Sequence, residues 1–138
     1  MREILFRGKR ADNGVWVEGA DIMHKTVRGE LCIADVGTDW VSVIPETVCQ
    51  FTGLYDKNGK KIFEGDIIRV EHDLWHGETK KTRESDIGVV IYNTNTAEFG
   101  AKTHGYSNCL KLRRWKGDFN EVIGNIHDKK LEDFENGC

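Results

Sequence analysis

The stretch that decides the fold is residues 50–70, QFTGLYDKNGKKIFEGDIIRV, in which glycine-containing corners separate short apolar runs. Asp56-Lys57-Asn58-Gly59 is a turn sequence, because asparagine and glycine tolerate positive φ and aspartate hydrogen-bonds its own local backbone. The apolar pairs 54–55 and 62–63 flank it as strand ends. The stretch therefore predicts a hairpin and a second corner, with six residues in structural turn roles: Gly53, Asp56, Asn58, Gly59, Gly65 and Asp66.

The same turn has a rival interpretation as a calcium-binding loop. An EF-hand loop needs the pattern D-x-D/N-x-D/N-G, with glycine at its sixth position and a glutamate at its twelfth. Here the glycine comes fourth, at Gly59, and Lys60-Lys61 occupy the next positions. This spacing excludes an EF-hand, and the turn interpretation stands.

The N-terminal part of the chain predicts short strands and one brief helix. Turn-forming residues separate five β-prone runs: 3–7, 15–18, 22–27, 30–34 and 40–44. Asp12-Asn13-Gly14 suits the turn of a hairpin between the first two runs. Pro45, the only proline, suits the first turn of a helix, so we expect a brief helix over residues 45–51.

The C-terminal half predicts a small SH3-like β-barrel. Residues 67–70 and 88–92 are nearly continuous apolar runs, typical of strands that are buried on both faces or central to a small barrel. Gly-Asp before the first run and Gly-Val-Val in the second resemble the hairpin of SH3-like barrels. The polar segment from His72 to Asp86 between them is expected to form a flexible loop. Three further runs predict strands: 97–100, 110–115 and 121–126.

These patterns predict a mainly β chain with an N-terminal β region over residues 1–52 and a barrel region over residues 53–138. One continuous domain over residues 1–138 is the alternative. A length of 138 residues is sufficient to bury a hydrophobic core without disulfides.

Composition and cysteine spacing narrow the class of protein. The net charge of −3 gives no strong field for nucleic acid or an anionic membrane. The chain contains no apolar leader, no 18-residue apolar run and no C-x-x-C pair, so we expect a cytoplasmic protein without a membrane partner. The four cysteines and five histidines lack the close pairs of structural zinc sites, and no metal or cofactor is expected.

Two segments are candidate binding surfaces. In residues 110–115, leucines alternate with basic residues, which predicts one apolar and one positive strand face carrying Lys111, Arg113, Arg114 and Trp115. A half-buried strand with a solvated outer face is the other interpretation. Trp75 is a second candidate, because Lys80, Lys81 and Arg83 follow it in sequence. An aromatic ring beside basic residues could stack on a base or form an oligomer contact.

One segment allows an enzymatic interpretation. His72-Asp73-Leu74-Trp75-His76 places two histidines four residues apart beside a carboxylate, which on a helix would bring both imidazoles to one face. A metal-dependent hydrolase or nuclease would further need another carboxylate, such as Glu71 or Asp86, at the same cleft. No helical pattern surrounds the segment, and an exposed loop is the other interpretation.

Three segments together resemble one known family. Residues 48–67 are similar to the hallmark pattern TVxQYTGLxDKNGxxIYEGDI of the YopX family of phage and prophage proteins. Residues 4–8 and 15–19 resemble the opening hairpin of that family, and residues 121–128 resemble its closing segment EVIGNIYEN. The resemblance implies a small β-rich protein, encoded by a phage or prophage and made in a bacterial cytoplasm.

The chain departs from the family pattern at a few aromatic and small positions. Phe51 and Phe63 stand where the family has tyrosines, which favours core or interface positions for these rings over catalytic ones. Cys49 replaces a usual glycine, and His127 replaces a tyrosine. The resemblance implies no reaction and no catalytic set.

The functional expectation is a non-enzymatic binding or assembly module. Short strands leave edges that could pair in a homo-oligomer. The sequence also allows a protein or nucleic-acid partner, which it does not identify. The alternative is the metal-dependent hydrolase or nuclease with His72, Asp73 and His76.

Overall fold

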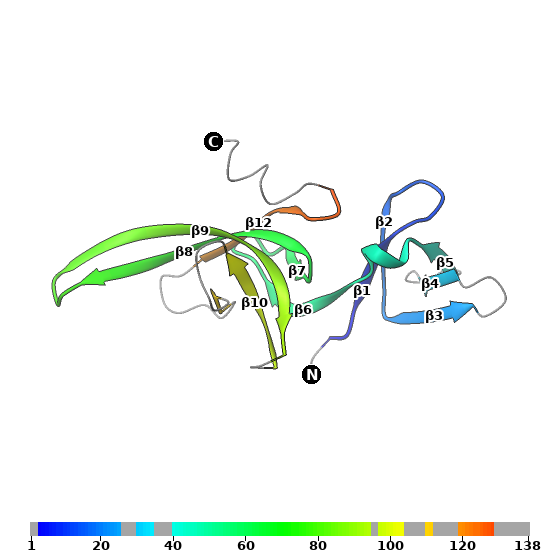
Figure 1. Cartoon of the computed structure of the whole chain (residues 1–138), viewed down its shortest axis with the longest axis horizontal. Coiled ribbons are helices and arrows are strands. Elements are labelled where there is room, and N and C mark those ends of the chain that lie inside the picture. The colour runs from blue at the N-terminus through cyan, green and yellow to red at the C-terminus, as the bar shows by residue number, and fades with distance from the viewer. Residues whose placement is uncertain are drawn as a thin grey trace. The chain divides into compact units, whose positions relative to one another are not determined.

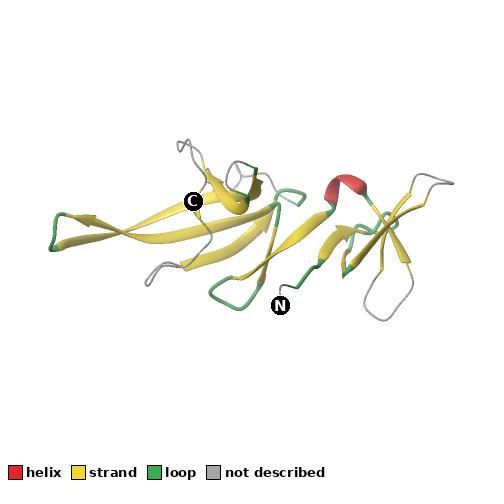
Figure 2. Cartoon of the chain, turned by 90° about the horizontal axis from the view of Figure 1, so that it is seen from below, coloured by secondary structure: helices red, strands yellow, loops and turns green. Residues whose placement is uncertain are grey.

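The computed structural model describes residues 3–25, 30–34, 40–94, 97–103, 110–111 and 119–128. The chain divides into two compact units, Met1–Gly53 (unit 1) and Leu54–Cys138 (unit 2). Nearly all regular structure in both units is antiparallel β-strand, which confirms the predicted mainly β class (Figures 1 and 2).

Unit 1 contains two groups of antiparallel strands. Its strands are β1 (Phe6–Lys9), β2 (Trp16–Gly19), β3 (Asp21–Lys25), β4 (Glu30–Ala34), β5 (Trp40–Val43) and most of β6 (Cys49–Tyr55). β1 pairs with β2 on one edge and β6 on the other, and β3, β4 and β5 form a three-stranded sheet in chain order. The turn between β1 and β2 is held by the Asn13 side chain, whose Oδ1 accepts a hydrogen bond from Val15 N at 3.0 Å.

The core of unit 1 lies where these strands pack together. Val17, Ile33 and Val43 are buried in one cluster, contributed by β2, β4 and β5. A Cβ atom on Gly19 would lie 1.8 Å from the carbonyl oxygen of Ala34, so only glycine permits this approach of β2 to β4.

The expectation of a helix over residues 45–51 is wrong beyond its first turn. A single 3-10 turn, η1, covers Pro45–Thr47, and β6 begins at Cys49. The sheet accounts for the difference, because Cys49 pairs with Arg7 of β1 and Phe51 N donates a hydrogen bond to Leu5 O at 2.8 Å. A helix over residues 49–51 would break this strand pairing.

Unit 2 is built around a five-stranded antiparallel sheet in the order β11-β10-β9-β8-β12. The strands of unit 2 are β7 (Lys61–Phe63), β8 (Asp66–His76), β9 (Lys80–Asn93), β10 (Glu98–Thr103), β11 (Leu110–Lys111) and β12 (Phe119–Asn125). β7 lies outside the five-stranded sheet and is the neighbour of β6, whose last residues belong to unit 2. Within the described residues, β11 and β12 stay at opposite ends of the sheet. The expected SH3-like barrel is therefore not confirmed.

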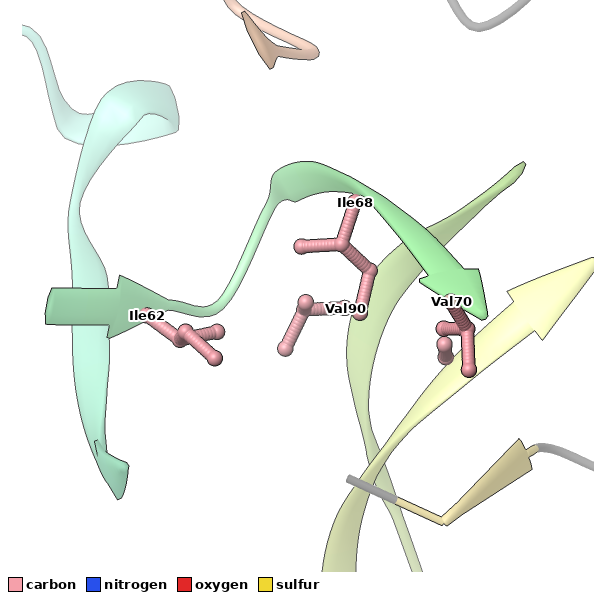
Figure 3. Close-up of a cluster of buried hydrophobic side chains, with 5 residues drawn as sticks. Ile62, Ile68, Val70 and Val90 are labelled. Atoms are coloured by element: carbon pink, nitrogen blue, oxygen red, sulfur yellow. The ribbon is translucent and has the colours of Figure 1, made fainter. Parts of the chain in front are cut away.

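The core of unit 2 lies against this sheet. Ile62, Ile68, Val70, Val90 and Ala101 form one buried cluster, with Phe99 and Val122 packed against it (Figure 3). Ile67, on the opposite face of β8, is buried as well. Both faces of β8 are thus covered near its start, as the continuous apolar run predicts. Phe63 is buried, as Phe51 is in unit 1, in line with the expectation that these rings are core members.

The expectation of a flexible loop from His72 to Asp86 is wrong. β8 and β9 pair without interruption, from Ile67 opposite Val89 to His76 opposite Lys80. Gly77, with φ +76°, begins the turn between them. We call residues 72–86 the arm. Its register places Asp73 opposite Arg83 and His72 opposite Glu84. This register joins positions from the two ends of the segment, a relation that apolar periodicity does not show.

Candidate functional site

The first carboxylate of the hallmark segment, Asp56, is a buried acceptor within its own turn. The residue is only 3% exposed. Its Oδ1 accepts hydrogen bonds from the backbone N atoms of Asn58 and Lys60, both at 2.9 Å, and its carbonyl oxygen accepts from Gly59 N at 3.0 Å. Gly59 has φ +80°, which only glycine adopts at little cost, and Gly53 has φ +86°.

The other oxygen of Asp56 connects the turn to β12. Asp56 Oδ2 accepts a hydrogen bond from Val122 N at 3.0 Å, across 66 residues of sequence. Beside it, Lys57 N donates to Asn120 O at 2.8 Å, and Lys57 Nζ lies 2.9 Å from a carboxylate oxygen of Glu121. The turn therefore lines one edge of β12, whose other edge pairs with β8.

The second carboxylate, Asp66, connects the next corner to the end of β12. It is 1% exposed. Asp66 Oδ2 accepts a hydrogen bond from Phe63 N at 2.8 Å, and Oδ1 accepts one from Asn125 Nδ2 at 3.1 Å. Asn125 Oδ1 in turn accepts from His127 N at 2.8 Å, which uses the remaining end of that amide.

The backbone of Gly65 completes this second connection. Gly65 N donates to Val90 O at 2.8 Å, and Gly65 O accepts from Ile126 N at 3.0 Å. With φ +86°, Gly65 adopts a conformation that other residues rarely take. We call the connections made by Asp56, Gly65, Asp66 and Asn125 the motif junction, because they join the hallmark segment to the closing segment.

The ionisation of Asp56 follows from these contacts. Burial alone would raise the pKa of Asp56, but the backbone N–H groups of Val122, Lys60 and Asn58 favour the carboxylate and lower the pKa below its ordinary value. The ionised form is thus the one that the folded state binds through hydrogen bonds.

A dependence of stability on pH follows. A carboxyl group with a lowered folded-state pKa stabilises the fold above the ordinary pKa of about 3.9, and this contribution disappears as the pH falls through the lowered value. We expect the unfolding temperature of the wild type to fall more steeply than that of Asp56→Asn between about pH 5 and pH 2. Thermal unfolding followed by circular dichroism measures this, and equal slopes for the two proteins would contradict it.

The motif junction is a structural site rather than a chemical one. Each oxygen of both carboxylates accepts at least one hydrogen bond from the protein, and both side chains are buried. The sequence pattern places Asp56 and Asp66 in turns, but it does not reveal their distant partners. Val122 follows Asp56 by 66 residues, and Asn125 follows Asp66 by 59 residues. No local motif signals such pairings.

The basic candidate segment is described only in part. Leu110 and Lys111 form β11, where Lys111 pairs with Gly100 of β10. The other predicted binding residues of this segment, Arg113, Arg114 and Trp115, lie outside the described residues. Whether this strand binds a partner stays a prediction.

Trp75 lies in β8 within the arm, where its register partner is Lys81. Near the tip, His76 Nε2 and Thr82 Oγ1 are 2.9 Å apart, a hydrogen bond between the two strands of the arm. His76 and the following turn residues are exposed. The candidate aromatic thus belongs to a paired β-ribbon and not to a loop.

The candidate metal ligands do not have the helical arrangement that their spacing would need. On a helix, residues four apart are about 6 Å apart, whereas in a strand they are separated by about 13 Å. His72 and His76 both lie in β8, and Asp73, between them, has Arg83 as its register partner. Over the part of the chain that the structure describes, no three His, Cys, Asp or Glu side chains gather as a metal site.

Most of the chain matches the model of one protein family. A family model described as YopX protein matches residues 6–131. No curated protein matches the chain. Among the described residues, no helix has the length and apolar character needed to cross a lipid bilayer.

Proposed function

Since the chain belongs to the YopX family, and since its hallmark residues build a structural junction, we propose that the protein is a non-enzymatic binding and assembly module. The arm is its contact element. As the family resemblance implies, the protein is encoded by a phage or prophage and acts in the cytoplasm of the bacterial host.

The extension of the arm beyond its sheet carries this proposal. Within the described residues, β12 pairs with β8 as far as Glu71, and β10 pairs with β9 as far as Gly88. β8 and β9 continue together to His76 and Lys80, with no third strand beside them among the described residues (Figure 1). An isolated two-stranded ribbon is only marginally stable in water, so an additional strand from a partner would stabilise it.

The composition of the arm favours a protein partner over nucleic acid. Residues 72–84 contain three Lys or Arg residues and three Asp or Glu residues, so the formal charge of this part is zero. Binding to phosphates requires a surplus of positive charge, and the whole chain is acidic as well, at −3. Trp75 near the tip belongs to a residue type enriched at protein interfaces.

Shortening the arm tests the proposal. In this variant, residues 72–84 are replaced by Asn-Gly, which forms a two-residue hairpin turn between the register partners Glu71 and Ser85. We expect the unfolding temperature of unit 2 to change little, because the buried cluster lies outside the arm, while self-association is lost. Size-exclusion chromatography with light scattering, at low and moderate salt, measures the mass of both proteins.

Three outcomes would contradict parts of this proposal. Unchanged association of the shortened chain would exclude the arm as the contact element. A wild type that remains a monomer would exclude assembly. A ratio of absorbance at 260 and 280 nm that reveals bound nucleic acid, removed by salt, would favour the basic strand at Lys111 as the binding surface instead.

A further inference from the structure

We infer that Asn58, in the turn of the hallmark segment, is a site of deamidation, at which water converts the asparagine to aspartate or isoaspartate. This inference goes beyond the proposed function, because it concerns a covalent modification at the motif junction and not a partner. It follows from the Asn58-Gly59 pair, from the side chain of Asn58 and from a second Asn-Gly pair that differs from it in one contact.

The reaction needs only this chain and water. The backbone N of Gly59 attacks Cγ of Asn58, and the new N–Cγ bond closes a five-membered succinimide ring. The proton of this N–H group passes to water or hydroxide, and the Cγ–Nδ2 bond breaks to release ammonia. Water then opens the ring at one of its two carbonyl carbons. Opening at Cγ leaves aspartate, whereas opening at the backbone carbonyl carbon leaves isoaspartate, whose main chain runs through Cβ and Cγ.

The first observation is that water reaches both reacting residues. Asn58 and Gly59 are exposed, and a Cβ atom on Gly59 would meet nothing within 4 Å. Because glycine has no side chain, nothing on Gly59 itself shields its N atom from attack. Gly59 N donates a hydrogen bond to Asp56 O at 3.0 Å, and this bond has to open before the ring closes.

The second observation is the freedom of the Asn58 side chain. Asn58 is held through its backbone, since its N atom donates to Asp56 Oδ1 at 2.9 Å. In the part of the chain that the structure describes, no hydrogen bond holds its side-chain amide. The side chain can therefore rotate to bring Cγ to Gly59 N without losing a contact.

The pair Asn13-Gly14, in the turn between β1 and β2, is a matched comparison within the same chain. Asn13 is also exposed, and Gly14 has φ +72°, close to the +80° of Gly59. The N atom of each glycine donates to a carbonyl oxygen of its own turn. The difference lies in the asparagine side chain, because Asn13 Oδ1 accepts a hydrogen bond from Val15 N at 3.0 Å. This bond restrains the rotation that ring closure requires.

The isoaspartate product would disturb the motif junction, whereas the aspartate product would not. Asp56 Oδ1 accepts hydrogen bonds from the N atoms of Asn58 and Lys60, which lie on either side of the altered linkage. An isoaspartate at position 58 adds one atom to the main chain between these donors, so they can no longer share one oxygen in the same geometry. Asp56 Oδ2 binds Val122 N, so the disturbance extends to the connection with β12.

Peptide mapping of the incubated protein tests the site. The folded chain is kept at mildly alkaline pH, and cleavage after glutamate then gives the peptides 4–18, 47–64 and 136–138, each with one Asn-Gly pair. Mass spectrometry measures the conversion of each peptide, and enzymatic methylation identifies isoaspartate. We expect Asn58 to convert several-fold faster than Asn13, up to about tenfold, since a single hydrogen bond restrains Asn13. In denaturant, we expect both to convert at similar rates.

Two variants separate the chemistry from its effect on the fold. Asn58→Gln keeps an amide at this exposed position but would have to close a larger ring, so we expect it to remain unconverted during the incubation. Asn58→Asp carries the charge of the product on an unaltered main chain. Ion-exchange chromatography isolates the converted wild type by its added charge. We expect its isoaspartate form to unfold at a lower temperature than Asn58→Asp, which unfolds close to the unconverted wild type.

Three outcomes would overturn the inference. An Asn58 that stays intact in the folded chain, or that converts no faster than Asn13, would exclude it as the favoured site. The same ratio of rates in denaturant would assign the difference to the neighbouring sequence and not to the fold. Equal unfolding temperatures of the isoaspartate form and Asn58→Asp would exclude an effect on the motif junction. None of these measurements involves the arm, so their outcome is separate from that of the proposed function.

Discussion

Replacing Asp66 with asparagine is expected to lower the free energy of unfolding of unit 2 by about 2–4 kcal/mol. Asp66 uses both oxygens as acceptors, from Phe63 N and from Asn125 Nδ2. In Asp66→Asn, one of these donors faces an amide NH₂ group instead. Rotation of Asn125 offers no relief, because its Oδ1 already accepts a hydrogen bond from His127 N. Chemical denaturation measures the loss.

The reciprocal exchange is the sharper form of this prediction. Asn125→Asp alone places two carboxylates against each other in a buried site and is expected to cost about 3 kcal/mol. In the double variant Asp66→Asn/Asn125→Asp, the amide donates to the carboxylate in the opposite direction, and the bonds from Phe63 N and His127 N remain. We expect most of the stability to return. Losses that simply add in the double variant would contradict the pairing.

Replacing Asp56 with alanine is expected to have an effect of similar size, about 2–4 kcal/mol. The change leaves the backbone N–H groups of Asn58, Lys60 and Val122 without their carboxylate acceptor. Asp56→Asn separates the two parts of this effect. Its amide oxygen still accepts hydrogen bonds from the two N–H groups of the turn, but its NH₂ group faces Val122 N. The loss of unfolding free energy in Asp56→Asn therefore measures the connection to β12.

Glu78→Gln is the matched control for both carboxylates. Glu78 lies in the exposed turn of the arm in the same unit, so loss of its charge leaves no buried donor unsatisfied. We expect its denaturation curve to overlay that of the wild type. An effect of Glu78→Gln as large as that of Asp56→Ala would show that charge, rather than hydrogen bonding at the motif junction, determines stability.

The sequence predicts local features of this fold well, because their causes are local. The β4 run at residues 30–34 and the first turn after Pro45 follow from β propensity and from the fixed φ of proline. The helix beyond Thr47 was an error, because pairing of Cys49 with β1 depends on residues more than 40 positions earlier. Tertiary pairing overrides a short local signal.

The arm shows a second limit of sequence patterns. Residues 72–86 have no apolar alternation and read as a polar loop, yet they form a regular ribbon. Its register joins positions such as Asp73 and Arg83, which are ten positions apart in sequence. Only the register shows that these positions face each other.

The motif junction shows the same limit for the candidate site. Asp56 and Asp66 could be placed in turns from the residues beside them. Their burial and their contacts with Val122 N and Asn125 could not be derived, because the closing strand returns to them only in the folded chain. For the basic residues near Lys111, the predicted role as a binding surface stays a prediction.

Native-state hydrogen exchange, resolved by residue with NMR, tests most directly whether the motif junction holds the hallmark and closing segments together. We expect the amides of Phe63 and Val122 to exchange only through global unfolding of unit 2, as slowly as the amide of Val90 in the buried cluster. We also expect Asp66→Asn to accelerate exchange of the Phe63 amide, and Asp56→Asn to accelerate exchange of the Val122 amide. Fast exchange of Phe63 and Val122 in the wild type, while Val90 stays protected, would contradict a structural role of the motif junction.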